Sequence, residues 1–292
     1  PINSILKKFG KEIPQKIGEL FSSNNRISDP IKTLISSEID CDRMDYLLRD
    51  GYNTGTKYGL VDLERIISAL TFSPDGNIAI KPKGIVAIEH FLILRNIMYR
   101  TIYNHRINEI CTWILENIIK KIRQDFNTNL WIDHSLYKWI FRPEELDFEN
   151  FLANDDIKLN YHLYKWKDEA PEPISTLCDM LINRKLLKAS NISFLSNLEK
   201  LEMLAFAQRK CEEFNFESSI FCGIKEKNFS GFKSNNSLKI WDGHFLSNLD
   251  NGSPLIKTLM KNQESALLIY PECIKEEIKK RILLYKNNQK CF

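Results

Sequence analysis

The sequence lacks the features of a membrane-spanning, secreted or disulfide-framed protein. No stretch approaches the roughly 18 uninterrupted apolar residues that a membrane helix needs, and the first residues contain no signal-peptide core. The seven cysteines are odd in number and scattered, and no two form a C-x-x-C pair, so neither a disulfide framework nor a zinc knuckle is indicated. We therefore expect a cytoplasmic protein with reduced cysteines and no membrane partner.

Charge of one sign is also scarce. Lys and Arg number 41 against 38 Asp and Glu, which leaves a formal net charge of +3 in 292 residues. So small an excess predicts no general polyanion-binding surface, and any phosphate chemistry must come from local clusters. Hydrophobic residues make up 43% and charged residues 27%, which excludes a disordered or fibrous protein and predicts one large or two modest domains.

Helical periodicity dominates the first 214 residues. One or two short helices are predicted within residues 1–30, and helical structure, continuous or with one break, is predicted over 31–50 with Gly51 as its stop. The longest pattern, from Gly84 to Gln124, predicts one long helix at the centre of the core. Further helices are expected over residues 62–70, 131–141, 144–153, 160–168, 173–187 and 195–214.

After about residue 215 the pattern changes to short apolar runs separated by Gly, Asn and Ser. The runs at 219–224, 238–240 and 266–270 predict strands, while 253–261 and 274–285 predict helices. We therefore expect a mainly α protein, with a helical domain over residues 1–214 and a small α+β region over 215–292.

The densest chemical signal is the run IDCDRMDYLLRD, which begins at Ile39. On a helix, Asp42, Tyr46 and Asp50 are spaced i, i+4 and i+8 and share one face. In one interpretation this face is a solvated surface whose carboxylates are offset by neighbouring arginines. In the other, it offers a carboxylate ligand to a metal beside a phosphorylated substrate.

A second constellation lies on the predicted long helix, where Arg95, Tyr99, Tyr103 and Arg106 follow at i, i+4, i+8 and i+11. Arg offers a planar fork for phosphate, and Tyr combines an aromatic face with a hydroxyl. The stripe fits a nucleotide-binding surface. It fits equally well a pair of half-buried core tyrosines flanked by arginines that reach water.

These two runs resemble two ordered blocks of the HD-domain phosphohydrolases, in the branch that contains the deoxynucleoside triphosphate triphosphohydrolases. The run ISSEIDCDRMDYLLRDGYNTGTKYGLVDLERII is similar to the first block, and AIEHFLILRNIMYRTIYNHR is similar to the second. The resemblance continues more weakly through Trp131–Leu187. It implies the C-terminal part of a helical HD domain, with metal-dependent hydrolysis of a deoxynucleoside triphosphate to a deoxynucleoside and inorganic triphosphate.

The resemblance also implies a role for each matching position. Asp42, the second acid of the I-D-x-D motif, resembles the family's metal-binding aspartate, and Asp40 resembles a neighbouring acid that orients the catalytic site. The metal would be a divalent or transition metal, with magnesium, manganese, iron and zinc all open. The implied substrate contacts are Arg43 and Arg95 for phosphate, Tyr46 and Asp50 for the sugar, and Tyr103 and Asn104 near the sugar and base.

The family's other metal ligands are a histidine and a later His-Asp pair, both upstream of the I-D-x-D block. This sequence has five histidines, none of them followed by Asp, and all lie downstream of Asp42. The chain therefore carries half of an active site. We expect a separate or cleaved N-terminal segment to supply the His and His-Asp ligands, within a homo-oligomer or hetero-oligomer.

Two other functions stay open at this point. The chain fits a non-catalytic subunit that senses a nucleotide or scaffolds a larger assembly, such as an antiviral complex. It also carries Trp131, Trp139 and Trp166 near lysines, a combination that can bind single-stranded nucleic acid. The amphipathic spacing of these tryptophans favours a place in the core instead.

Overall fold

The computed structural model describes residues 2–22, 30–125, 130–232, 238–261 and 263–289. The chain divides into two compact units, each with its own hydrophobic core. The first unit comprises Pro1–Tyr103 and Phe229–Gln263, and the second comprises Asn104–Asn228 and Glu264–Phe292. The boundary expected between residues 214 and 215 falls inside the second unit, and that division stays a prediction.

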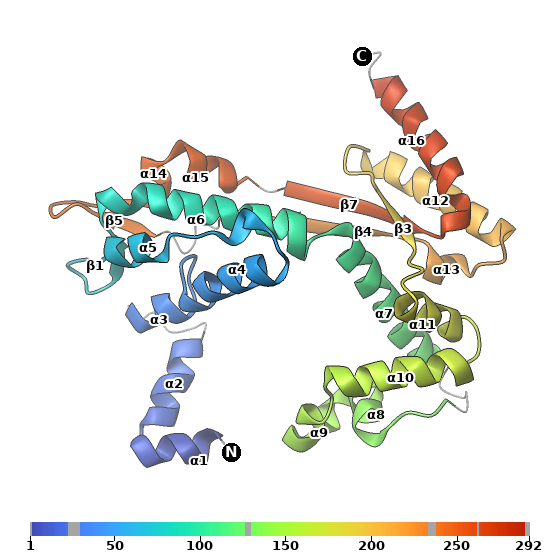
Figure 1. Cartoon of the computed structure of the whole chain (residues 1–292), viewed down its shortest axis with the longest axis horizontal. Helices are drawn as coiled ribbons and strands as arrows, with labels where there is room; N and C mark the ends of the chain where they lie inside the picture. The colour runs from blue at the N-terminus through green and yellow to red at the C-terminus, as the bar shows by residue number, and fades with distance from the viewer. Residues whose placement is uncertain (1, 23–29, 126–129, 233–237, 262, 290–292) are drawn as a thin grey trace. The chain divides into compact units, whose positions relative to one another are not determined.

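Both units are mainly helical and each contains a small sheet, which confirms the predicted fold class (Figure 1). In the part of the chain that the structure describes, no helix has the length and apolar character needed to cross a bilayer.

The first unit buries the inner faces of its longer helices against a four-stranded sheet. Its helices are α1 (Ile2–Leu6), α2 (Ile13–Phe21), α3 (Pro30–Ile35), α4 (Cys41–Asn53), α5 (Leu63–Ala69), α6 (Ile85–Met98), the π-helix η4 (Tyr99–Tyr103), α14 (Leu249–Gly252) and α15 (Pro254–Leu259). Its strands are β1 (Leu70–Phe72), β2 (Ile78–Ile80), β5 (Lys239–Trp241) and β6 (Leu246–Asn248), in the order β1-β2-β5-β6. The antiparallel hairpin β1–β2 encloses a turn over residues 73–77, whose Pro, Asp, Gly and Asn favour a tight turn, and Gly76 takes a φ of 77°.

Helix α4 forms from the acidic run because its sequence caps one end and buries one face. The side chain of Asp40 accepts a hydrogen bond from the backbone N–H of Arg43 at 2.8 Å, which satisfies a free donor of the first turn. Met44 and Leu47 are buried in the core of the first unit. The remaining charged residues of the run are left on the other faces of the helix.

Gly51 does not stop this helix, so that prediction is wrong. Helix α4 continues to Asn53, and Gly51 is buried where the backbone passes close to Gly59. A Cβ on Gly51 would lie 2.8 Å from the Cα of Gly59. The glycine is required here for a close approach of two backbone segments rather than for the end of the helix.

The single helix predicted from Gly84 to Gln124 is also wrong. Helix α6 ends at Met98, the π-helix η4 follows, and a separate helix, α7 (Arg106–Gln124), begins after a cap by His105. The His105 Nδ1 accepts a hydrogen bond from the backbone N–H of Ile107 at 3.3 Å. The apolar periodicity runs across this break because each helix buries a face in the core of its own unit.

The second unit packs its helices around two hydrophobic clusters and a three-stranded sheet. Besides α7, its helices are α8 (His134–Phe141), α9 (Phe148–Leu152), α10 (Asp156–Glu169), α11 (Ile174–Ile182), α12 (Asn197–Glu213), α13 (Ser218–Phe221) and α16 (Lys275–Gln289). Its strands are β3 (Lys188–Asn191), β4 (Gly223–Phe229) and β7 (Gln263–Tyr270), in the order β3-β7-β4. Strands β3 and β7 are antiparallel, with Ala189 opposite Ile269.

Short apolar runs in this unit were assigned to the wrong element in two places. The strand expected over 219–224 begins only at Gly223, because Ser218–Phe221 forms the helical turn α13. The helix expected over 173–187 ends at Ile182, and strand β3 follows. Both segments are too short for periodicity to separate a strand from a helical turn.

Candidate functional site

Two arginines and two carboxylates form a buried cluster at the start of α4. Glu38, in the turn before the helix, pairs with Arg95 from α6, and the same carboxylate oxygen lies 3.4 Å from Nη1 of Arg43. The Arg43 Nε lies 3.4 Å from Oδ2 of Asp40. The side chains of Glu38 and Arg95 are only 4% and 8% exposed, so their pair is shielded from water. Both predicted phosphate contacts therefore lie in one cluster, and each has an internal counter-charge.

Asp40 caps the helix rather than offering a free acid. Its Oδ1 accepts the backbone N–H of Arg43 at 2.8 Å, and its Oδ2 accepts the backbone N–H of Ser37 at 3.2 Å. Both oxygens thus hold the chain at the start of α4. The role predicted for Asp40, an acid that orients the site, stays a prediction.

Aromatic side chains from α4 and the π-helix η4 meet in the same unit. The rings of Tyr46 and Tyr103 pack edge to face with centroids 5.9 Å apart, and Tyr99 lies 5.0 Å from Tyr103. Tyr99 also stacks on Phe229 at 4.9 Å. The Tyr103 hydroxyl donates to Oδ2 of Asp50 at 2.6 Å, and the hydroxyls of Tyr46 and Tyr99 lie 3.4 Å apart.

The charged cluster and the aromatic cluster adjoin. The guanidinium of Arg95 lies 5.7 Å from the centre of the Tyr99 ring, which is within the range of a cation–π contact. The structure therefore brings together five of the predicted substrate contacts, namely Arg43, Tyr46, Asp50, Arg95 and Tyr103. Two of the aromatic residues sit in a π-helix, a conformation that is frequent at functional sites.

The tyrosines of this cluster are donors rather than bases. Burial, and then the hydrogen bond with Tyr99, raises the pKa of Tyr46 above its ordinary value. Burial, and then the hydrogen bond to Asp50, raises the pKa of Tyr103 as well. Both phenols are therefore protonated at neutral pH, and Tyr103 uses its proton in the hydrogen bond to Asp50.

Asp42, the predicted metal ligand, lies on the exposed side of α4. It makes no hydrogen bond or ion pair with another described residue. Among the described residues, no three His, Cys, Asp or Glu side chains gather where they could hold a metal ion. One carboxylate does not hold a catalytic metal by itself. These residues therefore do not make a metal site on their own.

Asn104 and Arg106 belong to the second unit, because the predicted helical stripe ends with η4. The Oδ1 of Asn104 accepts a hydrogen bond from Nζ of Lys227 at 3.4 Å. Arg106 opens α7 and lines a pocket of about 400 Å³. Arg95, Tyr99 and Tyr103 of the predicted stripe therefore lie in the first unit, whereas Arg106 lines a pocket of the second unit.

This second-unit pocket is basic. Besides apolar side chains, its lining includes Arg106, Arg184, Lys188, Lys275, Lys279, Ser190 and Tyr270. The lysines have acidic partners, since Lys188 and Lys275 pair with Glu272, at 3.1 Å and 3.5 Å, and Lys279 pairs with Glu276. Neither arginine has an acidic partner among the described residues. The pocket draws on three distant stretches of sequence, so no local motif indicated it.

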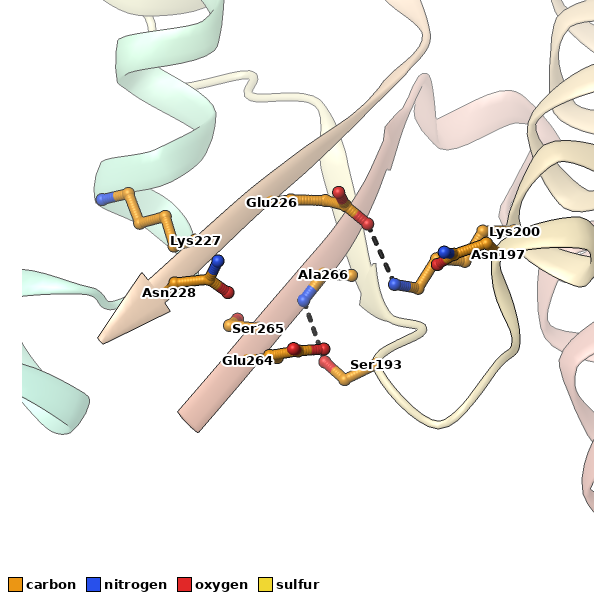
Figure 2. A pocket seen from close by; sticks show the side chains of 9 residues that line it. All are labelled: Ser193, Asn197, Lys200, Glu226, Lys227, Asn228, Glu264, Ser265 and Ala266. Atoms are coloured by element: carbon orange, nitrogen blue, oxygen red, sulfur yellow. Dashed lines mark hydrogen bonds and ion pairs between the residues drawn. The ribbon is translucent and has the colours of Figure 1, made fainter. Parts of the chain in front are cut away.

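Figure 2 shows another pocket of the second unit, of about 250 Å³, between the strands β4 and β7 and the start of α12. Lys200 pairs with Glu226 across it at 2.9 Å, and the Ser193 hydroxyl accepts the backbone N–H of Ala266 at 2.9 Å. Lys227 pairs with the buried Glu109. These contacts hold the sheet and helix together, and the pocket's two lysines are already paired.

The tryptophans of the second unit do not form one exposed face. Trp166 is fully buried, as its spacing predicted, and its Nε1 donates to the carbonyl of Trp131 at 2.9 Å. Trp131 and Trp139 are 44% and 45% exposed, so the core position predicted for these two is wrong. Trp131 stacks on the buried ring of His162, whose Nε2 accepts the backbone N–H of Asp133 at 3.1 Å. Trp166 is therefore unavailable for stacking on a nucleic-acid base.

Comparison with known proteins places the chain in a family. Residues 61–282 match the family described as HD associated region. The chain belongs to that family. This HD associated region protein is 32% identical over 188 residues to the uncharacterized protein YwfO of Bacillus subtilis, which covers 64% of the chain and 43% of YwfO. It is 32% identical over 299 residues to the uncharacterized protein MJ1154 of Methanocaldococcus jannaschii, which covers 97% of the chain and 60% of MJ1154. The chain therefore spans about half the length of these relatives.

Solved structures share the fold of this HD associated region protein. A phosphohydrolase from Bacteroides thetaiotaomicron superposes with a TM-score of 0.73 and 23% identity, over 92% of this chain and 71% of that one. A hypothetical protein from Aquifex aeolicus gives a TM-score of 0.72 and 22% identity, over 96% of this chain and 68% of that one. The fold is thus like that of a phosphohydrolase.

Two residues of the first unit were missed by the sequence analysis. Glu38 stands two positions before Asp40, and its only signal was one more acid beside the I-D-x-D motif. Phe229 carried no signal, since it meets Tyr99 only through the fold. Tyr99 itself lay on the predicted stripe but was given no role.

Proposed function

We propose that this chain is the substrate-binding half of an HD-type phosphohydrolase that acts on deoxynucleoside triphosphates, with a deoxynucleoside and inorganic triphosphate as products. The observation that carries the proposal is the joining of the two sequence blocks, in which the Tyr103 hydroxyl of η4 donates to Asp50 of α4. The phosphohydrolase-like fold and the HD associated region family support it.

The chemistry assigned to these residues follows from what they offer. The rings of Tyr46 and Tyr103 present faces to a sugar, and the carboxylate of Asp50, which already accepts the Tyr103 hydroxyl, can also accept a hydrogen bond from a sugar hydroxyl. Arg43 and Arg95 carry the planar forks that recognise phosphate. We also propose that Asn104, at the start of the second unit, contacts the substrate near its base.

The metal requires donors beyond this chain's described residues. Asp42 would supply one carboxylate, and we propose that a polypeptide carrying the His and His-Asp ligands supplies the others, within an oligomer. Such a metal would lower the pKa of a bound water. The partial coverage of YwfO and MJ1154 leaves room in those relatives for such a segment.

The test is to co-express the chain with a polypeptide that bears the His and His-Asp ligands and to measure metal-dependent release of inorganic triphosphate. We expect Asp42→Asn to lower the rate of triphosphate release by about a hundredfold or more, because the metal loses one of its protein ligands. Asp45→Asn is the matched control, since Asp45 is exposed on the same helix and, within the described part of the chain, pairs only with Arg49. An unchanged rate in Asp42→Asn refutes the proposal.

A second candidate is nucleotide sensing without turnover, and the basic pocket of the second unit favours it. Arg106 and Arg184 line this pocket without an acidic partner among the described residues, so they suit the phosphates of a nucleotide. Arg184→Ala is then expected to weaken binding of deoxynucleoside triphosphates by about tenfold in equilibrium dialysis. Lys185→Ala is the control, because this neighbouring side chain is 74% exposed and does not line the pocket. Equal affinity in both variants excludes the sensing site.

A further inference from the structure

The predicted phosphate contact Arg95 is occupied within the protein itself. Its Nη1 donates to Oε2 of Glu38, and the pair is almost fully buried. The Nε of Arg95 is buried too and has no hydrogen-bond partner. A phosphate that is to be held by Arg95 must therefore meet a guanidinium that already has an anion on one of its nitrogens.

The cluster around Arg95 is electrically balanced. Two guanidinium groups, on Arg43 and Arg95, face two carboxylates, on Glu38 and Asp40. Such balance is needed because a buried charge without a partner is costly. An entering phosphate adds negative charge, but the positive charge of both guanidinium groups is already balanced by carboxylates. One internal carboxylate must therefore leave the cluster when the phosphate binds.

The two carboxylates differ in how firmly they are held. Asp40 accepts two backbone hydrogen bonds at the N-cap of α4, so its removal would undo the helix end. Glu38 contacts only the two guanidinium groups among the described residues, and it has no backbone donor there. Its longer side chain also has more rotatable bonds. Glu38 is therefore the carboxylate that can leave.

Resting on the proposed function, we infer that Glu38 is an internal substitute for a substrate phosphate: it occupies Arg95 in the free protein and is displaced when a triphosphate binds. Arg43 marks the direction of this exchange, because its side chain is 27% exposed whereas that of Arg95 is 8% exposed. A phosphate group meets Arg43 first and reaches Arg95 as Glu38 turns away. Glu38 is thus a positioning residue that sets how strongly the triphosphate, but not the nucleoside, is bound.

The experiment measures binding of the four deoxynucleoside triphosphates and of the matching deoxynucleosides by titration calorimetry, without added metal. All proteins carry Arg184→Ala, so that the pocket of the second unit does not contribute. In Glu38→Gln we expect the triphosphate to bind about tenfold more tightly, because it no longer competes with a carboxylate. Deoxynucleoside binding is expected to stay the same.

A merely structural role for Glu38 predicts a different pattern. A lower thermal midpoint of the free protein is expected in either case, because Arg95 loses its charged partner. A structural role alone would leave the triphosphate affinity equal or weaker, and that result overturns the inference. Glu38→Asp keeps the negative charge on a shorter side chain, so we expect its triphosphate affinity to rise less than that of Glu38→Gln. The Glu38→Asp variant replaces Glu38→Gln in the experiment if Glu38→Gln does not fold. Asp45→Asn, which opens an exposed pair on the same helix, should change neither affinity.

The outcomes also separate this inference from the proposed function. If the parent protein binds both triphosphates and deoxynucleosides but Glu38→Gln gains nothing, only the role of Glu38 is wrong. If the parent protein binds neither ligand, the proposed function fails and the exchange fails with it.

Discussion

In the first unit, Arg43 and Arg95 are paired with carboxylates inside the fold, whereas in the second unit Arg106 and Arg184 line a pocket without an acidic partner among the described residues. The difference follows from burial. A guanidinium removed from water needs a counter-charge in the protein itself, while one at the wall of an open pocket stays hydrated until a ligand arrives. A basic residue in a candidate site therefore indicates a free anion-binding group only after its internal partners are known.

The sharpest test of this comparison removes one arginine from each unit. Arg95→Ala leaves Glu38 buried without its main partner, so we expect the free energy of unfolding to fall by about 3 kcal/mol. Arg106→Ala removes an exposed side chain and is expected to change the free energy of unfolding by less than about 0.5 kcal/mol. Urea titration, with hydrogen exchange to assign the loss to a unit, measures both. Equal losses would contradict the contrast.

A smaller effect is expected from a pair of tyrosine–carboxylate bonds, one taken from each unit. Tyr103 donates to Asp50 at 2.6 Å in the first unit, and Tyr285 donates to Glu202 at 3.0 Å in the second. We expect Tyr103→Phe to cost about 1.5 kcal/mol, since a hydrogen bond to a charged group is lost in a half-buried site. The solvent-exposed bond of Tyr285 should cost less than about 0.5 kcal/mol in Tyr285→Phe.

These two variants also differ in their effect on binding. Tyr103→Phe should weaken deoxynucleoside binding, because the ring loses the hydroxyl beside Asp50. Tyr285→Phe should not. A loss of stability in Tyr103→Phe without any loss of deoxynucleoside affinity would restrict this bond to a structural role.

The smallest expected effect is a pH dependence that belongs to the second unit. Burial lowers the pKa of His162 below its ordinary value, so between the folded and unfolded pKa values the unfolded chain binds the proton more readily. The contribution of neutral His162 to the free energy of unfolding is fully present above the unfolded pKa of about 6.5. This contribution is lost as the pH falls below that value toward the folded pKa. Hydrogen exchange at pH 7 and pH 5.5, corrected for intrinsic rates, should show a loss of at most about 1 kcal/mol in the second unit.

The matched variant for this prediction is His162→Gln, which should abolish the pH dependence in the second unit. In the first unit, His90 and His244 are exposed, so its exchange should change little over the same range. An equal response of both units would show that His162 is not the group responsible.

Much of the local structure could be predicted from the sequence. The helical character of α4, the β1–β2 turn and the mainly helical fold class all follow from short-range patterns of polar and apolar residues. The N-cap at Asp40 was not predicted, because it falls inside the helical segment expected over 31–50. The break at η4 could not be predicted in this way. Apolar residues continue at threes and fours on both sides of it, although they are buried in the cores of different units.

The candidate site shows the same difference between local patterns and long-range contacts. The sequence by itself determined which side chains are candidates for the site, because the I-D-x-D block and the tyrosine stripe are local patterns at helical spacing. Only the tertiary structure decided their partners. Glu38 reaches Arg95, and Phe229 reaches Tyr99, through contacts between segments far apart in the chain. Such contacts depend on how buried faces pack, and the charge state and availability of each group follow from that packing.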